Sequence, residues 1–309
     1  MNMKYIYYKS EKGNFGDDLN EWLWPKLFGS FQKSDLNFIG IGSILFPENK
    51  QIGAIKGENK IVFGTGVRPT PNYSVLELDN TWNISFLRGP LSAYMLDNKH
   101  EYITDAAYAV RQVENFDSLL NTEKKYEVSL MPYFKSLEYF DWPAICKELG
   151  YHYISPLSEN GVEFTMREIA ASKRIITEAM HGAIVADLLR VPWHRFVFST
   201  PHTEGSKISD FKWTDWTLSM KMANPPVTFI PFYLDTRLNQ HCLNLTGKRI
   251  SPQFFLKGRI RKEVLKNLNN IDEYSLSKSE ILADIDRRIA DKIEALKAEI
   301  NCKTFAHHS

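Results

Sequence analysis

A single histidine lies where a predicted strand gives way to a predicted helix. Residues 173–177 predict a strand that ends at Thr177, and a helical pattern begins near His181 and stops before Pro192. His181 therefore lies at a helix N-terminus, where unpaired amides and the helix dipole favour an anion such as phosphate. Its imidazole adds a hydrogen-bond donor and a titratable proton. The alternative is a buried histidine that is satisfied by a backbone carbonyl.

Four basic residues are candidates to complete an anion site. Arg88 follows the predicted strand 83–87, so it should lie at the end of a sheet, where a guanidinium can bind a carboxylate or phosphate through two hydrogen bonds. Arg68 has the same kind of position after a glycine-rich turn, and Lys207 and Lys212 lie in a predicted loop. Each one alone is typical of a surface charge. Together, at strand ends, they indicate a local anion site.

Two adjacent carboxylates, Asp17 and Asp18, lie between the first predicted strand and the first predicted helix. Carboxylates suit hydrogen bonding to sugar hydroxyls, or removal of a proton from one. Helix capping is the alternative, and it accounts for one aspartate rather than both. The spacing of Gly13 and Gly16 matches neither a dinucleotide fingerprint nor a P-loop, so neither an NAD site nor a nucleoside-triphosphatase is supported.

Short apolar strands that alternate with helices would position these residues. The first third of the chain predicts strands near residues 4–8, 36–41, 60–64, 83–87 and 101–104. Most of these strands run into glycine or aspartate at their carboxyl ends. Because ligands of open α/β sheets bind outside those ends, we expect a cleft along one edge of this region.

A second series follows the polar stretch at residues 121–125. It predicts strands near 126–130, 151–154, 173–177 and 194–198, and helices near 136–149, 165–172, 181–190 and 214–222. The pattern indicates the α/β class, with two doubly wound domains that face a cleft. We expect these domains at residues 1–122 and 123–255, followed by a helical extension at 256–309.

The extension predicts one long amphipathic helix. Ser277 and Glu280 have the spacing of a capping box, so the helix should begin at residue 278. Apolar residues then recur every three or four positions as far as Ile300, a stripe that needs a partner surface: the body of the protein, a second copy in a homodimer, or a membrane. Basic residues within 257–266 would attract anionic lipid weakly.

Composition excludes several other classes of protein. The 309 residues carry 38 Lys and Arg against 37 Asp and Glu, a net charge of +1, which gives no global field for nucleic acid. The three cysteines are far apart and form no zinc motif, so we expect a reducing cytoplasm and no metal. We see neither a secretion signal nor a membrane-spanning run. Serine hydrolase, zinc protease, calcium-sensor and kinase motifs are missing from the sequence, which leaves a transferase cleft.

Several motifs, taken in order, resemble the polysaccharide pyruvyl transferase family. They are Gly13-Asn14-Phe15-Gly16-Asp17, Arg88-Gly89-Pro90-Leu91-Ser92-Ala93, Asp105-Ala106-Ala107 and His181-Gly182-Ala183-Ile184. Residues 23–25, 40–45, 177–182 and 212–216 are similar to its succinoglycan-type, ketal-forming branch. The resemblance implies a fold like the two-domain B-type glycosyltransferases. It also implies phosphoenolpyruvate as donor substrate, with no further cofactor, and two hydroxyls of a glycan as acceptor.

The resemblance also implies roles for individual residues. His181 would bind phosphate and act as general acid, Arg88 would hold the donor's carboxylate or phosphate, and Asp17 or Asp18 would orient or deprotonate the acceptor. The further substrate contacts would be Asn14, Gly16, Asp18, Arg68, Glu178, Gly182, Lys207 and Lys212. Members of this kind usually act on a lipid-linked oligosaccharide at the cytoplasmic face of the membrane, in exopolysaccharide, lipopolysaccharide or capsule biosynthesis.

One position departs from the family pattern. Ala179 stands where many members carry an arginine, two residues before the histidine, so Arg88, Lys207 or Lys212 would have to supply the phosphate-binding charge. Two other functions fit the same cleft: a glycosyltransferase that uses a sugar nucleotide, and a non-catalytic glycan-binding subunit.

Overall fold

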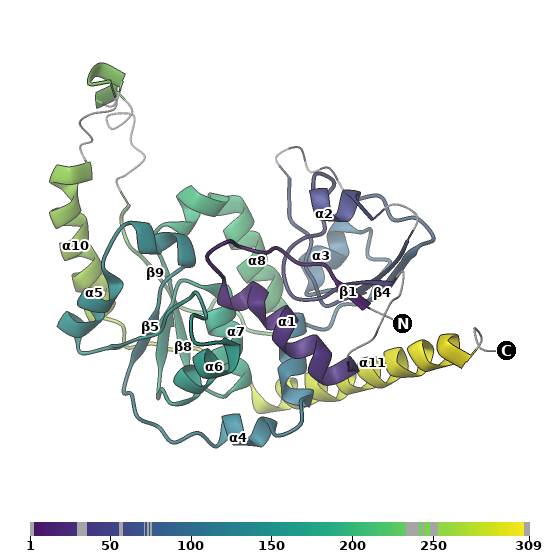
Figure 1. Cartoon of the computed structure of the whole chain (residues 1–309). Coiled ribbons are helices and arrows are strands. Elements are labelled where there is room, and N and C mark those ends of the chain that lie inside the picture. The colour runs from purple at the N-terminus through teal and green to yellow at the C-terminus, as the bar shows by residue number, and fades with distance from the viewer. Residues whose placement is uncertain are drawn as a thin grey trace.

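Two parallel sheets lie side by side in the computed structural model (Figure 1). It describes residues 3–29, 36–55, 58–70, 72, 74, 76–232, 241–242, 244–247 and 253–305. Helices pack around and between the sheets, and further helices follow the second sheet. The predicted α/β class with C-terminal helices is confirmed. The exact domain limits stay predictions.

The first sheet contains four parallel strands in chain order, so within the described strands it lacks the reversal of the doubly wound sheet that the sequence predicts here. The strands are β1 (Met3–Tyr5), β2 (Leu36–Ile39), β3 (Asn59–Phe63) and β4 (Trp82–Phe86). The helices of this part are α1 (Phe15–Phe28), α2 (Lys50–Gly53) and α3 (Pro90–Met95). The strand predicted at 101–104 is wrong, because that segment pairs only through one bridge, between Leu87 and Tyr102.

The second sheet has five parallel strands in the order β6-β5-β7-β8-β9. They are β5 (Ser129–Met131), β6 (His152–Tyr153), β7 (Ile175–Thr177), β8 (Trp193–Val197) and β9 (Val227–Phe229), of which β9 was not predicted. The chain leaves β5 toward one edge and returns to the other side at β7. This reversal is the doubly wound arrangement, and it opens a crevice beyond the carboxyl ends of β5 and β7.

Helices and tight turns cover the second sheet and join it to the first. They are η1 (Ala106–Gln112), α4 (Phe116–Leu120), η2 (Phe134–Glu138), α5 (Trp142–Leu149), α6 (Val162–Ala170), α7 (Met180–Leu188), η3 (Pro201–Gly205) and α8 (Ser206–Ser219). The helix predicted at 136–149 is split, because Asp141 caps α5 and Pro143 occupies its first turn. The helix predicted at 214–222 begins earlier, at Ser206.

Helix α1 packs against the first sheet and also holds a loop that reaches the cleft. Trp24 packs edge-on against Phe38 of β2, with ring centroids 4.8 Å apart. One turn earlier, the Asn20 side chain accepts from the Ile41 N–H at 2.9 Å and donates to the Ile41 carbonyl at 3.1 Å. A single buried amide therefore holds the chain where it leaves β2 and enters residues 42–44.

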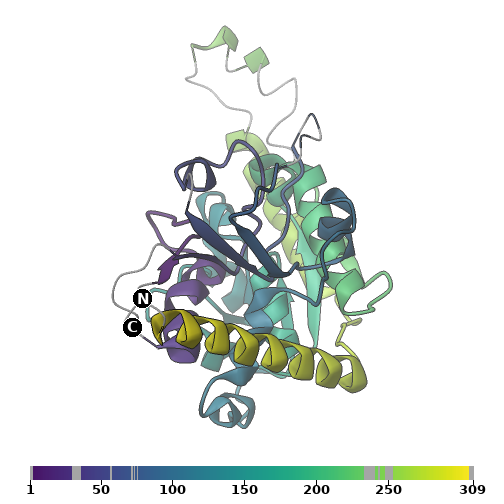
Figure 2. The ribbon, with the colours of Figure 1, turned by 90° about the vertical axis from the view of Figure 1, so that its right-hand side faces the viewer.

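The two C-terminal helices are α10 (Gln253–Asn269) and α11 (Ser279–Phe305). Helix α11 begins one residue later than predicted, but the predicted capping box is wrong: the Ser277 N–H and Oγ both donate to Asp187, each at 2.7 Å. Its apolar residues, from Leu282 to Ile300, are buried in the core that also contains α1, η1 and α7. The chain's own body thus covers the stripe. Figures 1 and 2 show from two sides how α11 lies along that body.

Helix α10 packs its apolar face on the second sheet's outer layer. Ile260, Val264 and Leu268 are buried beside Trp142 of α5, while Arg261 forms an ion pair with Glu148 at 2.5 Å. A membrane contact through its exposed basic residues stays a prediction. Among the helices in the described ranges, none is both long and apolar enough to cross a bilayer.

Candidate active site

A cavity of about 490 Å³ lies between the carboxyl ends of the two sheets. The first half of the chain lines it with Tyr8, Lys9, Asn14, Phe15, Gly16, Asp17, Gly42, Ser43, Ile44, Phe46, Glu48, Asn49, Lys50, Gln51 and Arg68. The second half contributes Tyr133, Phe134, Lys135, Pro156, Ala179, Met180, His181, Thr203, Glu204, Ile208 and Lys212. Its volume falls in the range of small-molecule sites.

The cavity coincides with the reversal of the second sheet. Residues 133–135 follow β5, and residues 179–181 follow β7, so both sides of the crevice contribute to the wall. Helices α1 and α7 both begin here, since Phe15 and Met180 are their first residues. Two positive helix ends therefore face one cavity, which favours an anionic ligand.

His181 lies where the sequence predicts it, in the first turn of α7. Its side chain is 14% exposed, and its Nε2 atom is 3.6 Å from Oδ1 of the fully buried Asp105. On the other side, the ring lies against Gly16 of α1: a Cβ built on that glycine would be 2.0 Å from Nδ1. The histidine of one half is thus seated against the first helix of the other.

Alanine at Gly16 is expected to displace the His181 ring and lower turnover by about tenfold or more, since small misplacements of catalytic groups are costly. Because Gly16 lies in the first turn of a long helix, the fold should survive. Steady-state kinetics with a melting curve checks both points. Gly53→Ala, where an added Cβ meets nothing within 4 Å, is the matched control. Normal turnover in Gly16→Ala would show that the ring tolerates displacement.

The structure separates the two adjacent aspartates. Asp18 accepts a hydrogen bond from the Asn14 N–H at 3.1 Å, which caps the start of α1. Asp17 lines the cavity and is 8% exposed, and the Asn14 amide donates to its carboxylate. Burial raises the pKa of Asp17 to about 6, although the charges of His181 and Lys212 oppose this rise. Of the two aspartates, Asp17 is therefore the one that lines the cavity.

A cluster of basic side chains lies beside one carboxylate in the cavity. Lys212 forms an ion pair with Glu204 at 2.6 Å, and Arg68 and Lys135 line the same space. Burial alone would raise the pKa of Glu204, but the charges of Lys212, Arg68 and Lys135 lower it below its usual value. Sequence reasoning missed Lys135 and Glu204, although Lys135 follows a strand predicted to end at 130.

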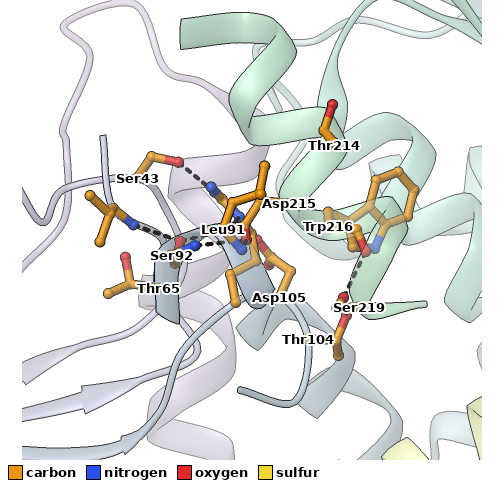
Figure 3. Close-up of polar contacts among 12 residues, drawn as sticks. Ser43, Thr65, Leu91, Ser92, Thr104, Asp105, Thr214, Asp215, Trp216 and Ser219 are labelled. Atoms are coloured by element: carbon orange, nitrogen blue, oxygen red, sulfur yellow. Dashed lines mark hydrogen bonds and ion pairs between the residues drawn. The ribbon is translucent and has the colours of Figure 1, made fainter. Parts of the chain in front are cut away.

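Arg88 is placed differently from the prediction. It is fully buried outside the cavity lining, and its Nε donates to Asp215 at 3.0 Å. The same carboxylate accepts from the Leu91 and Ser92 N–H groups and the Ser92 hydroxyl, a network visible in Figure 3. Arg88 reaches the site only through Ser43, whose Oγ accepts from Nη1. Arg88 therefore binds a carboxylate of the protein itself, Asp215 of α8, and not that of a substrate as predicted.

Glu178 lies behind the wall of the cavity. Its Oε1 accepts from the backbone N–H groups of residues 198–200, at 2.7 to 3.0 Å. Its Oε2 accepts from the Tyr133 N–H and the Ser136 hydroxyl. Burial raises the pKa of Glu178, and the hydrogen bonds oppose this. Because its acceptor sites are occupied, Glu178 joins the ends of β5, β7 and β8 instead of lining the cavity.

Of the remaining residues predicted to contact substrate, some line the cavity and others do not. Gly182 packs inward, since a Cβ there would be 2.5 Å from Thr177 Oγ1. Lys207 is exposed and does not line the cavity. Ala179 does line it, so of the three cations suggested to replace the family arginine, Lys212 is the one the structure brings to the site. No group of His, Cys, Asp or Glu within the described ranges could hold a metal ion.

Similarity to known proteins is weak at the level of structure. No model of a known protein family matches the chain. Among solved structures, an uncharacterised protein, KP1_0663 from Klebsiella pneumoniae subsp. pneumoniae NTUH-K2044, has a TM-score of 0.45 at 16% identity, covering 74% of this chain and 92% of its own. The Wall Teichoic Acid Polymerase TagF (H548A) has a TM-score of 0.38 at 12% identity, covering 96% and 89%.

The fold and cavity define an α/β protein of two parallel sheets, with a histidine, a carboxylate and basic side chains in the cleft between them. The chain is 36% identical over 230 residues to the Succinoglycan biosynthesis protein ExoV of Rhizobium meliloti (strain 1021), covering 72% of this chain and 67% of that protein. It belongs to the succinoglycan-type branch of the polysaccharide pyruvyl transferase family.

Proposed function

We propose that this protein transfers the pyruvyl group of phosphoenolpyruvate onto two hydroxyls of a glycan sugar and forms a cyclic ketal. The observation that carries the proposal is one cavity at which two helices begin, with Asp17 in the first turn of α1, His181 in the first turn of α7, and Lys212 of α8 beside them. The name of the relative, a succinoglycan biosynthesis protein, supports a role in bacterial polysaccharide assembly. A lipid-linked acceptor would place the reaction at the cytoplasmic face of the membrane.

Donor binding would use the basic side of the cavity. Lys212, Arg68 and Lys135 would neutralise the phosphate and carboxylate of phosphoenolpyruvate, together with the amides at the start of α7. His181, as imidazolium, gives its proton to the methylene carbon: the N–H bond breaks, a C–H bond forms, and positive charge develops at the adjacent carbon. Fixed charges and dipoles around that carbon stabilise the transition state.

The acceptor would react on the Asp17 side. Asp17 takes the proton of the first hydroxyl as its oxygen bonds to the cationic carbon. The bond between that carbon and the phosphate oxygen then breaks, its electron pair leaves with phosphate, and the oxygen of the second hydroxyl bonds to the carbon and closes the ring. The proton of the second hydroxyl leaves on inorganic phosphate, and the proton held by Asp17 returns to His181. Atoms and charges balance, because one hydroxyl proton ends in the new methyl group and the other on phosphate.

The burial of Asp17 gives the reaction a pH dependence. As pH falls through about 6, Asp17 takes up a proton and can no longer act as a base, so kcat/KM should fall on the acid side. The Asp17→Asn variant should have a kcat/KM about 10²-fold lower at neutral pH. It should also lack the fall in kcat/KM that protonation of Asp17 causes in the wild-type protein. The second pKa of a phosphate monoester is also about 6, so the donor itself titrates in this range. The difference between the wild-type and Asp17→Asn profiles therefore isolates the aspartate, and identical profiles would exclude Asp17 as the base.

The function itself is tested by inorganic phosphate release from phosphoenolpyruvate in the presence of galactosides, glucosides and N-acetylmannosaminides. Acceptor-dependent release, with a product heavier by the pyruvyl ketal, would establish the activity. Thermal-shift measurements with phosphoenolpyruvate and with sugar nucleotides show which ligand stabilises the protein. Stabilisation by UDP- or GDP-sugars but not by phosphoenolpyruvate, with no release for any acceptor, would overturn the proposal in favour of glycosyl transfer.

A further inference from the structure

Two polar atoms in one pair of side chains are buried without a partner. Within the described part of the chain, Asp105 Oδ2 and His181 Nε2 have no hydrogen bond, while Nε2 lies 3.6 Å from Asp105 Oδ1. Asp105 is fully buried just before η1 and appears among the labelled residues of Figure 3. Because buried polar groups are nearly always paired in native proteins, two orphans at one contact indicate a function.

Helix capping does not explain the carboxylate. Asp105 Oδ1 accepts from the Ala107 N–H at 3.0 Å, which caps η1. Asparagine or serine would make this hydrogen bond equally well without a buried charge. Burial of a carboxylate is costly unless the charge has a partner. His181 supplies that partner, since its imidazole becomes cationic when it takes up a proton.

We propose that Asp105 is a positioning residue for His181, which accepts the Nε2 proton and leaves Nδ1 as the nitrogen that exchanges protons with the substrate. The geometry supports this assignment, because Nε2 is buried on the Asp105 side and Nδ1 lies beside Gly16, a residue of the cavity wall. The assignment of Nδ1 as the proton donor rests on the proposed function, whereas the contact with Asp105 does not.

The two ring nitrogens of His181 have different roles in this proposal. The Nδ1–H bond breaks as the C–H bond of the substrate forms, while the Nε2–H bond stays intact and is held by Asp105, whose carboxylate stays ionised throughout. The carboxylate stabilises the imidazolium before transfer and fixes the ring plane. A distance of 3.6 Å is compatible with this role, because catalytic hydrogen bonds often tighten when substrate binds.

Variants that keep the cap but lose the charge test the proposal. Asp105→Ser and Asp105→Asn both retain an acceptor for the Ala107 N–H, so the melting temperature should stay near that of wild type. We expect kcat to fall by about 10²-fold in both, with the affinity for phosphoenolpyruvate, measured by calorimetry, little changed. Asp105→Ala loses cap and charge together, so its difference from Asp105→Ser shows what the cap contributes to stability. Folded Asp105→Ser and Asp105→Asn proteins with wild-type kcat would overturn the proposal.

A spectroscopic measurement on the free protein needs no reaction. In ¹⁵N-histidine NMR spectra, with His181→Ala used for assignment, neutral His181 should carry its proton on Nε2 in wild type and lose that preference in Asp105→Ser. Neutral wild-type His181 protonated on Nδ1 would refute the proposal, whichever variants fold. If the protein neither bound phosphoenolpyruvate nor released phosphate, the proposed function would fail, and the spectrum would still decide whether Asp105 orients His181.

Discussion

Replacement of His181 by alanine is expected to lower kcat by about 10²–10⁴-fold, the usual contribution of a positioned general acid. The reason is its placement: a nearly buried imidazole in the first turn of α7, between Asp105 and Gly16, at the wall of the cavity. The affinity for phosphoenolpyruvate should fall much less, because basic side chains in the same cavity still attract its charges. Phosphate release measured at saturating donor, together with calorimetry, separates the two effects.

His152→Ala is a matched control for this experiment. His152 stacks on Tyr126 and pairs with Glu168, and it does not line the cavity, so the variant should keep its turnover. A His181→Ala protein that turns over at the wild-type rate would remove the general-acid role from this residue. It would leave the α7 N-terminus as a binding element alone.

Asparagine at Asp215 is expected to lower the free energy of unfolding by about 3–5 kcal/mol, because it leaves the fully buried Arg88 guanidinium without a counter-charge. Asp215 is the carboxylate that pairs with Arg88 among the described residues. The substitution preserves size and still offers an oxygen to the N–H groups of Leu91 and Ser92. Denaturant unfolding followed by tryptophan fluorescence would measure the loss.

Two further variants make this prediction specific. Arg88→Met should cost less than Asp215→Asn, since the remaining carboxylate keeps three donors, from Leu91 and Ser92. The double variant should be more stable than Asp215→Asn alone, because no unpaired charge stays buried. Equal losses in both single variants, or strictly additive losses in the double variant, would mean that the pair is not the source of the stability.

Local sequence was sufficient to place His181 but not to distinguish Asp17 from Asp18. His181 was predictable because a strand, a polar turn and a helix follow one another in adjacent residues, which fixes the histidine at a helix start. Asp17 and Asp18 could not be distinguished, since both lie in the first turn of α1 and only the tertiary structure shows which of them faces the cavity.

Predictions failed where a distant partner decides the role of a side chain. Arg88 has the sequence position of an anion-binding residue, but its Nε donates to Asp215, 127 residues further along, and the side chain is buried outside the cavity. Ser277 has capping-box spacing, but Asp187 takes both of its donors. Local spacing reports which hydrogen bonds a residue is able to make. It does not report which competing partner the fold brings nearer.

Helix α11 has a mechanical consequence for substrate capture. It is 27 residues long and starts beside Asp187 of the second half, whereas Glu299 near its end meets Asn83 of the first sheet. Many two-domain enzymes close around substrate by hinge rotation, with loosely joined lobes. Here rotation of one lobe would shear the buried stripe of α11 away from the core that it shares with α1 and α7. Helix α11 thus opposes rotation of the two halves, and we expect the cleft to be largely preassembled before substrate binds.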